Sequence, residues 1–295
     1  MPFRFDVEQT VTRNLRQIAT EQVRQSIAEL SDPQLDRTET VHNARKRCKK
    51  IRGLLRLVRP SVEGIFRNEN LHFRDAAQRL SEVRDADALV EAFELFRNEE
   101  GQSLSPDILD SIADRLAKHS ESVGISKVES DRRITEFLAD MEAALERIPT
   151  WKCGCRGFRA LRGGIEKTYS RGCETMTRAA DIPSDDNLHQ WRKRAKYHWY
   201  HVRLLRDYCR SKFKARAKRL KKLSDVLGDD HDLAVLRQFV IEHPDSVPSP
   251  GTMFEVVQAV DSRRHRLQHE SQQIGKTLYV ESPKSWTRHL EKRFK

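Results

Sequence analysis

Two stretches of the sequence, VHNARKRCKKIRGLLRLVR at residues 41–59 and LHQWRKRAKYHWYHVRLLR at residues 188–206, repeat one arrangement of basic and apolar side chains. Carried forward without a gap, the offset that aligns them also aligns residues 80–85 with 227–232. Two separated matches at one offset are hard to obtain by chance, so the sequence predicts an internal duplication. Eight positions of the two stretches are identical at an offset of 147 residues: His42/His189, Arg45/Arg192, Lys46/Lys193, Arg47/Arg194, Lys49/Lys196, Arg56/Arg203, Leu57/Leu204 and Arg59/Arg206.

The rest of the chain favours a helical protein. Its 295 residues lie near the size at which one hydrophobic core stops growing, so we expect two halves, 1–149 and 150–295. The 12 Gly and 10 Pro cluster between long helix-favouring stretches, and no alternating strand pattern stands out. The predicted fold is all-α, with two pseudo-symmetric four-helix bundles packed together. The expected helices cover residues 7–30, 38–58, 62–97, 105–148 with a break near Gly124, 155–179, 187–207, 210–241, 251–279 and 284–292.

On a helix, each repeated stretch forms two parallel stripes. In the first copy the apolar stripe is Val41, Ala44, Cys48, Ile51, Leu55 and Val58, and the basic stripe is His42, Arg45, Lys49, Arg52 and Arg56. In the second copy the apolar stripe is Leu188, Trp191, Ala195, Val202 and Leu205, and the basic stripe is His189, Arg192, Lys196 and Arg203. The stripes are one position apart, or about 100° on an ideal helix. We therefore expect the cations to flank a buried face.

The positive charge of the chain is segregated. Residues 41–59 and 210–222 each carry eight Lys or Arg and no acid; residues 188–206 carry six and no acid, and residues 152–171 carry six with Glu166. These windows hold a net charge of +27 against +11 for the whole chain, which leaves −16 for the remainder. Basic helices usually relieve their repulsion with acids one turn away, and two of these windows are the repeated helices. The pattern predicts a polyanionic partner.

Other features limit the location and chemistry of the protein. No apolar run approaches the roughly 18 residues of a membrane span, and Asp6 and Glu8 lie where a signal peptide would be apolar. The five cysteines are odd in number and lack the paired spacing of a zinc site or a disulfide framework. We therefore expect a cytoplasmic protein with no metal, no cofactor and no catalytic residue.

The duplicated HxxRxxxK pattern resembles that of the CHAD family, as do the RDAD segment at residues 84–87 and LGDDHDLAVL at residues 227–236. The resemblance covers nearly the whole chain, so residues 1–295 are expected to form a single CHAD-like domain. It implies two four-helix bundles and binding of inorganic polyphosphate in a basic groove or pore between them. Where the second copy is expected to carry an Arg it has Trp199, followed by Tyr200, so Arg203 is the candidate replacement.

Polyphosphate offers only charge to recognise, which suits a mixed Arg and Lys lining. The resemblance and the basic stripes together give the expected binding residues His42, Arg45, Lys46, Lys49, Arg52, Arg56, His189, Arg192, Lys193, Lys196 and Arg203. Supporting or solvated charges are expected at Arg162, Lys167, Arg171, Lys214, Lys218, Lys221 and Lys222.

Three alternatives stay open. His231 and Asp232 resemble the pair of a metal-dependent HD phosphohydrolase, although the offset aligns His231 with Arg84, which cannot ligate a metal. Binding of RNA or DNA is the second, because Trp191, Tyr197, Trp199 and Tyr200 are interleaved with the cations of one window. The third is a module that docks on polyphosphate or storage granules. We expect a non-catalytic protein.

Overall fold

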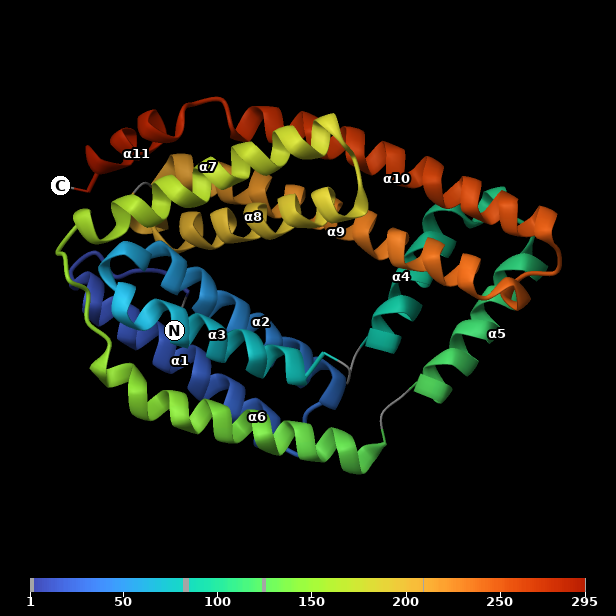
Figure 1. Cartoon of the computed structure of the whole chain (residues 1–295), viewed down its shortest axis with the longest axis horizontal. Helices are drawn as coiled ribbons and strands as arrows, with labels where there is room; N and C mark the ends of the chain where they lie inside the picture. Colours follow the sequence, from blue (N-terminus) through green and yellow to red (C-terminus); the bar gives the residue numbers. More distant parts are fainter. Residues whose placement is uncertain (1–2, 82–84, 124–125, 209, 295) are drawn as a thin grey trace.

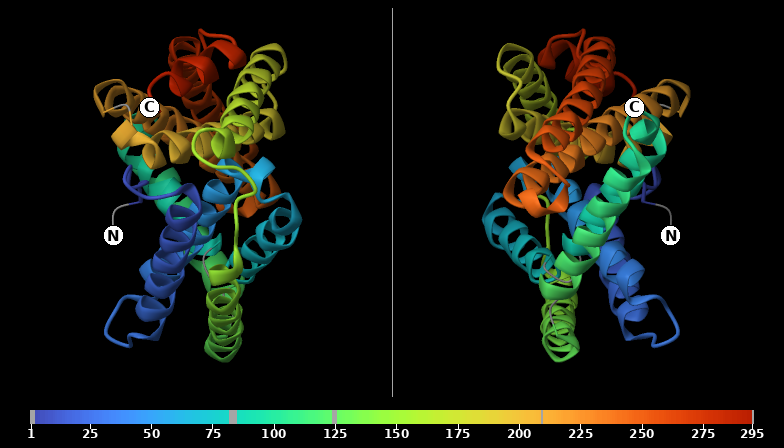
Figure 2. Two further views of the ribbon diagram at one scale, coloured as in Figure 1. Left: turned by 90° about the vertical axis from the view of Figure 1, so that its left-hand side faces the viewer. Right: turned by 90° about the vertical axis from the view of Figure 1, so that its right-hand side faces the viewer.

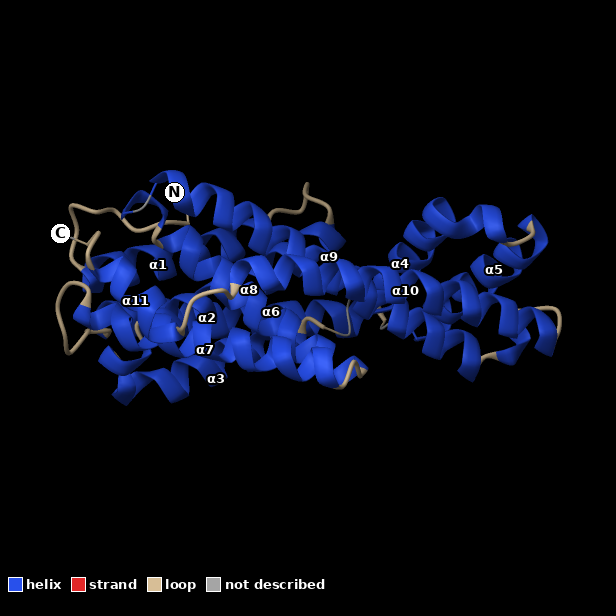
Figure 3. Cartoon of the chain, turned by 90° about the horizontal axis from the view of Figure 1, so that it is seen from above, coloured by secondary structure: helices blue, strands red, loops and turns tan. Residues whose placement is uncertain are grey.

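The computed structural model describes residues 3–81, 85–123, 126–208 and 210–294, which form eleven α-helices and no strand (Figure 1). This confirms the predicted all-α class. The helices are α1 (Val11–Ser31), α2 (Arg37–Leu57), α3 (Glu63–Arg79), α4 (Asp85–Glu100), α5 (Pro106–Val123), α6 (Lys127–Arg147), α7 (Arg159–Asp181), α8 (Asp185–Leu204), α9 (Arg210–Glu242), α10 (Pro250–Leu278) and α11 (Pro283–Glu291). Both ends of the chain lie at the same end of the molecule (Figure 3).

Two four-helix bundles make up most of the molecule. In the first, α2 packs between α1 and α3, and α6 lies against both α1 and α3. In the second, α8 packs between α7 and α9, α10 lies along α9, and α11 covers part of α7. Helices α2 and α8 pack against each other where the bundles meet, and Figure 2 shows α6 and α10 on opposite sides of the molecule.

The expected single helix over residues 62–97 is wrong. Helix α3 ends at Arg79 and α4 begins at Asp85, whereas α9, at the corresponding place in the second half, is continuous over 33 residues. The reason is packing, because Leu80 is buried in one hydrophobic core and Phe93 in another, so the chain has to change direction between them. The predicted break near Gly124 is confirmed, since α5 ends at Val123 and α6 begins at Lys127.

Helices α4 and α5 lie on the outer part of the second bundle. They pack with the outer ends of α9 and α10 around a separate core, and together these segments form the lobe seen at the right of Figure 3. This core is built from Phe93, Phe96, Leu116, Phe239 and Val240 among others. Residues from the first half of the sequence thus complete a core of the second half.

Helices α2 and α8 begin and pack as their sequences dictate. Asp36 and Ser184 cap their N-termini, accepting hydrogen bonds from the backbone N–H groups of Glu39 and Asn187. Every residue of the two predicted apolar stripes is buried, from Val41 to Val58 and from Leu188 to Leu205, which confirms this part of the prediction. The cations beside the stripes are thereby fixed at the junction of the bundles.

The contact between α2 and α8 follows the 147-residue offset. Gly53 meets Tyr200, its own offset counterpart, so closely that a Cβ atom at position 53 would lie 2.8 Å from Cδ2 of the Tyr200 ring. The ring N–H of buried His201 donates to the carbonyl oxygen of Gly53 across 3.1 Å. A contact between equivalent positions is what a two-fold axis relating two similar halves would produce.

Candidate functional site

Cations of α2 and α8 converge at the junction of the two bundles. We call this set, Arg45, Lys49 and Arg52 from α2 with Arg192 and Lys196 from α8, the paired-helix cluster. Desolvation at the junction, followed by repulsion from Arg45, Arg192, Lys196 and Arg52, lowers the pKa of Lys49 to about 8. The Lys49 side chain still reaches solvent, and it forms no ion pair with a carboxylate among the described residues. The structure therefore brings together cations that lie 147 residues apart in sequence.

Neighbouring groups orient the cluster and only partly offset its charge. Arg45 donates to the hydroxyl of Ser81 across 3.0 Å, and Arg52 donates to the side-chain oxygen of Asn70 across 3.3 Å. Asp232 approaches Arg192 at 3.8 Å, as expected for an acid that orients a neighbouring cation. Desolvation and then repulsion from Arg192 lower the pKa of Lys196. Among the described residues, neither Lys49 nor Lys196 forms an ion pair with a carboxylate, so these two charges lie close together without a counter-charge.

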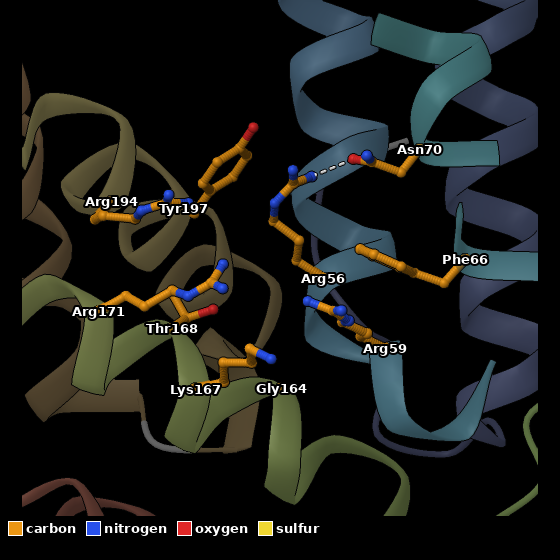
Figure 4. Close-up of a pocket in the computed structure, with 10 residues that line it drawn as sticks. All are labelled: Arg56, Arg59, Phe66, Asn70, Gly164, Lys167, Thr168, Arg171, Arg194 and Tyr197. Atoms are coloured by element: carbon orange, nitrogen blue, oxygen red, sulfur yellow. Dashed lines mark hydrogen bonds between the residues drawn. The ribbon is translucent and has the colours of Figure 1, made fainter. Parts of the chain in front are cut away.

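At the far end of α2 the same stripe enters a pocket between the bundles (Figure 4). This basic pocket is a cavity of about 230 Å³ formed by α2, α3, α7, α8 and the short 3-10 turn Arg59–Ser61. Side chains from both bundles point into it (Figure 4). Its lining is Arg56, Arg59, Phe66, Asn70, Gly164, Lys167, Thr168, Arg171, Arg194 and Tyr197.

Aromatic and neutral groups hold two of these cations in place. Arg56 lies 4.2 Å from the ring centre of Tyr197 and donates to Asn70 across 2.5 Å, and Arg59 lies 4.5 Å from the ring centre of Phe66. Burial is the main reason why the pKa of Arg56 falls to about 10; burial also lowers the pKa of Arg194. Guanidinium groups ordered by neutral partners keep their full charge for a ligand.

Helix α7 approaches α2 closely enough to close one side of the pocket. A Cβ atom on Gly164 would lie 1.9 Å from the carbonyl oxygen of Leu57, and one on Gly163 would lie 2.6 Å from Pro60. The pair of glycines therefore allows α7 to lie directly on the end of α2. Lys167 and Arg171, one and two turns further along α7, reach the pocket as a result.

One expected binding residue, Arg203, lies away from both the cluster and the pocket. Arg203 stacks on Trp199 at 4.8 Å and on Phe3 at 5.5 Å, on the other side of the α2/α8 contact. Lys46 and Lys193 are exposed, and His42 is half-buried. The ring of His189 lies 4.4 Å from that of His231, and burial followed by repulsion from His231 lowers the pKa of His189 to about 4. His189 therefore brings a neutral imidazole to the site at neutral pH.

The supporting charges divide into three groups. Lys167 and Arg171 line the basic pocket, whereas Lys214 and Lys218 are exposed on α9. The others form ion pairs with acids: Arg162 with Glu291, Lys221 with Asp225 and Lys222 with Glu270. Arg84 of the RDAD segment lies outside the described residues, as do the side chains of Asp85 and Asp87.

Sequence reasoning missed part of the pocket lining. Arg59 continues the spacing of the first basic stripe but was not among the expected binding residues. Arg194 lies off the second stripe, and Tyr197, Thr168 and Asn70 carry no charge to mark them. The one signal was the Gly163–Gly164 pair inside a basic window predicted to be helical. Two adjacent glycines in a helix often indicate a close approach of another backbone.

The aromatic and histidine side chains are mostly occupied by packing. Trp191 and Tyr200 are buried, Tyr197 lies under Arg56, and Trp199 is covered on one side by Arg203 and Lys196. Within the described parts of the chain, no group of three or more His, Cys, Asp or Glu side chains has a geometry suited to a metal ion. In the same residues, no helix is apolar and long enough to span a membrane.

Comparison with known proteins identifies the family. The family model described as CHAD domain matches residues 17–240. The crystal structure of the CHAD domain from the plant Ricinus communis superposes with a TM-score of 0.54 at 18% sequence identity, covering 99% of this chain and 96% of that one. At this identity the similarity shows the fold, and no curated protein matches the sequence. Because the family match covers most of its length, the chain belongs to the CHAD domain family.

Proposed function

We propose that this protein binds inorganic polyphosphate along the paired-helix cluster and does not hydrolyse it. The observation that carries the proposal is the convergence of Lys49, Arg192 and Lys196, two of which are offset counterparts. Among the described residues, Asp232 approaches Arg192, and neither lysine forms an ion pair with a carboxylate. A linear polyanion would offset the repulsion from neighbouring cations that, after desolvation, lowers the pKa of Lys49. Such a protein could attach itself to polyphosphate granules through this site alone.

The chemistry of the cluster suits a ligand without bases. Its cations come from two helices that meet at an angle, and the aromatic rings beside them serve mainly as supports for Arg and Lys. Recognition of a polyphosphate chain needs only charge and hydrogen-bond donors, which Arg supplies as a planar fork and Lys as a point charge. Nucleic acid would add stacking that Trp191 and Tyr200, being buried, do not offer.

The primary test measures the affinity for long-chain polyphosphate by calorimetry over a series of salt concentrations. Because binding releases counterions, the logarithm of the affinity should fall linearly with the logarithm of salt, by roughly 0.7 to 0.9 per phosphate contact. A phosphate-release assay, with and without divalent metal, runs beside it. Affinity that does not depend on salt would contradict the proposed binding mode, and metal-dependent phosphate release would contradict the absence of hydrolysis.

Paired substitutions locate the site. Arg45→Ala with Lys49→Ala, or Arg192→Ala with Lys196→Ala, should each weaken long-chain binding about tenfold or more and reduce the salt slope by roughly 1.4 to 1.8. The control is Lys118→Ala with Lys127→Ala, which removes the same charge from exposed positions on α5 and α6. Equal effects of cluster and control variants would mean that net charge alone holds the ligand. Competition with RNA separates the remaining alternative, since polyphosphate should displace RNA readily.

A further inference from the structure

The basic pocket differs in form from the open paired-helix cluster, because it is a bounded cavity lined from both bundles. Its volume of about 230 Å³ is many times what a single water needs, so it has room for a phosphate group with several waters. We infer that the basic pocket takes a compact oligophosphate group, either free tripolyphosphate or the terminal units of a longer chain. The chain-end form of this inference rests on the proposed function, whereas the tripolyphosphate form does not.

The charge of the pocket is not neutralised by the protein. None of its five cations, Arg56, Arg59, Lys167, Arg171 and Arg194, forms an ion pair with a carboxylate in the part of the chain that the structure describes. Glu174 acts on the pKa of Arg194 without forming an ion pair with it, and its carboxylate accepts a hydrogen bond from Ser170. Removing cations from water without a counter-charge costs free energy, so an anion that enters the pocket is favoured.

The cations are also positioned in advance. Arg56 is held by the side chain of Asn70, the carbonyl oxygen of Arg52 and the ring of Tyr197, all of them uncharged. Phe66 supports Arg59 in the same way. Binding therefore orders few additional side chains, which favours a small ligand that makes all its contacts within one cavity. The hydroxyl group of Thr168 lines the same cavity and can donate to a phosphate oxygen.

The offset counterpart of this pocket is closed. There, Arg47 pairs with Glu29, and the Phe3 ring lies against Lys50 and Arg203. Asp207 pairs with Arg4 at 3.2 Å and lies 3.7 Å from Arg206. The acids have no equivalent on the open side, where Met176 and Pro60 occupy the positions of Glu29 and Asp207. The repeated cations therefore have different surroundings on the two sides. Among the described residues, those of the basic pocket face a cavity and pair with no carboxylate, whereas on the other side Glu29 pairs with Arg47 and Phe3 covers two more.

The pocket is continuous with the cluster. Lys49, Arg52 and Arg56 follow one another at steps of three and four along α2, and Arg52 and Arg56 share Asn70 as a hydrogen-bond acceptor. Seven residues of helix span about 10 Å, which a chain of a few phosphate units covers. A polyphosphate chain in the cluster can therefore place its end in the pocket without leaving the surface of α2.

The test compares two double variants that remove equal charge from offset positions. Arg59→Gln with Arg171→Gln alters the pocket, and Arg24→Gln with Arg206→Gln alters the closed side. Titration with tripolyphosphate should show one site per chain, weakened about tenfold or more by the first pair and less than twofold by the second. Lys167→Glu and its control Arg24→Glu repeat the comparison at exposed positions, where folding is not at risk.

A second titration identifies the source of the phosphate. Long chains are compared with chains whose terminal phosphates are blocked as phosphoramidates. If chain ends enter the pocket, blocking should weaken binding to the unaltered protein and have no effect on the pocket variants. If the pocket takes only free tripolyphosphate, blocked and unblocked chains should bind with equal affinity. The pocket variants should still bind tripolyphosphate more weakly than the unaltered protein does.

The two proposals fail differently. The pocket assignment would be overturned if the pocket and closed-side variants lost tripolyphosphate affinity equally, or if neither lost any. Binding of long chains in the cluster would be unaffected by either result. The proposed function would be overturned if the unaltered protein did not bind long chains. If the pocket variants still lost their affinity for tripolyphosphate, the pocket would remain a site for free oligophosphate.

Discussion

The two faces of the α2/α8 contact carry similar cations but differ in what surrounds them. The open face is the basic pocket, and the closed face is its offset counterpart. Four cations of the open face have offset counterparts on the closed face: Arg56/Arg203, Arg59/Arg206, Arg171/Arg24 and Arg194/Arg47. Lys167 is the fifth cation of the open face, and Lys50 is the fifth of the closed face. On the open face the cations line a cavity between helices of both bundles. On the closed face Glu29 pairs with Arg47, Asp207 is shared between Arg4 and Arg206, and Phe3 lies over two other cations. Repeated cations are therefore not enough to make a binding site, because their neighbours decide whether the charge is available.

The difference comes from single positions outside the repeated stretches. Thr168 on the open face corresponds to Glu21, which accepts a hydrogen bond from Gln25, and Gly164 corresponds to Gln17. The N-terminal segment adds Phe3, and the backbone N–H of Phe5 anchors this segment by donating to the carbonyl oxygen of Leu204 across 2.8 Å. Small, uncharged residues keep one face open, and acids with an inserted ring close the other.

The largest expected effect comes from disturbing the backbone contact that forms one side of the open face. Gly164→Ala would place a methyl group 1.9 Å from the carbonyl oxygen of Leu57, and α7 would have to move away from α2. We expect a loss of about 3 kcal/mol in the free energy of unfolding, since a clash with backbone cannot be relieved by a rotamer change. Denaturant unfolding measures this, together with loss of tripolyphosphate binding.

Gly64→Ala is the matched control for that substitution. No atom lies within 4 Å of a Cβ atom at Gly64, so the change should be neutral or slightly stabilising. If Gly164→Ala were equally mild, then the close approach of α7 and α2 would not be what holds the pocket open.

A smaller effect is expected from opening the closed face. Phe3 is 6% exposed, and its ring packs edge-on against Tyr200 at 5.7 Å. Phe3→Ala should cost about 2 to 3 kcal/mol, toward the lower end for a buried Phe because the terminal segment can relax. The exposed Phe254→Ala is the control, with almost no expected change in stability.

The same variant tests the expectation that tripolyphosphate does not bind at the closed face. Because Glu29 and Asp207 remain, we expect tripolyphosphate still to occupy one site per chain in the Phe3→Ala protein. A second site of similar affinity would mean that the ring alone blocks the closed face and that the acids contribute nothing.

The general plan of the molecule could be predicted from the sequence because it depends on local periodicity. The apolar stripes beginning at Val41 and Leu188 are both buried as expected, and the break near Gly124 follows from a turn-forming residue. The break between α3 and α4 was missed. Residues 62–97 read as one helix, and the cause of the break is a long-range one, the burial of Leu80 and Phe93 in different cores.

The site was predicted less completely for a similar reason. The spacing of Arg45, Lys49 and Arg192 placed them on basic stripes, and the structure brings them together. No periodic pattern shows that Arg203 faces Phe3 or that Arg171 faces Arg56 across a cavity, because those contacts depend on how whole bundles pack. The charge state of His189 likewise depends on His231, which is far away in sequence.

The smallest expected effect is a pH dependence that distinguishes the faces. Lys49 on the cluster and Lys50 toward the closed face both have a pKa of about 8, chiefly through desolvation, against the usual 10.5. In each case neighbouring cations add to the shift, with Arg45 and Arg192 acting on Lys49 and Arg203 acting on Lys50. As the pH rises from 7 to 9 the free protein loses these protons. Bound polyphosphate would retain the proton on Lys49 alone.

Affinity for long-chain polyphosphate should therefore fall between pH 7 and pH 9, by at most about tenfold for one coupled proton. Lys49→Arg should flatten this profile because Arg stays charged, whereas Lys50→Arg should leave it unchanged. Stability of the free protein should move the other way. Between about pH 8 and 10.5 the unfolded chain binds more protons at these lysines than the folded one, so the free energy of unfolding rises with pH. Calorimetry and denaturant unfolding at each pH measure both trends. A binding profile flattened by Lys50→Arg instead of Lys49→Arg would show that the ligand lies on the closed face.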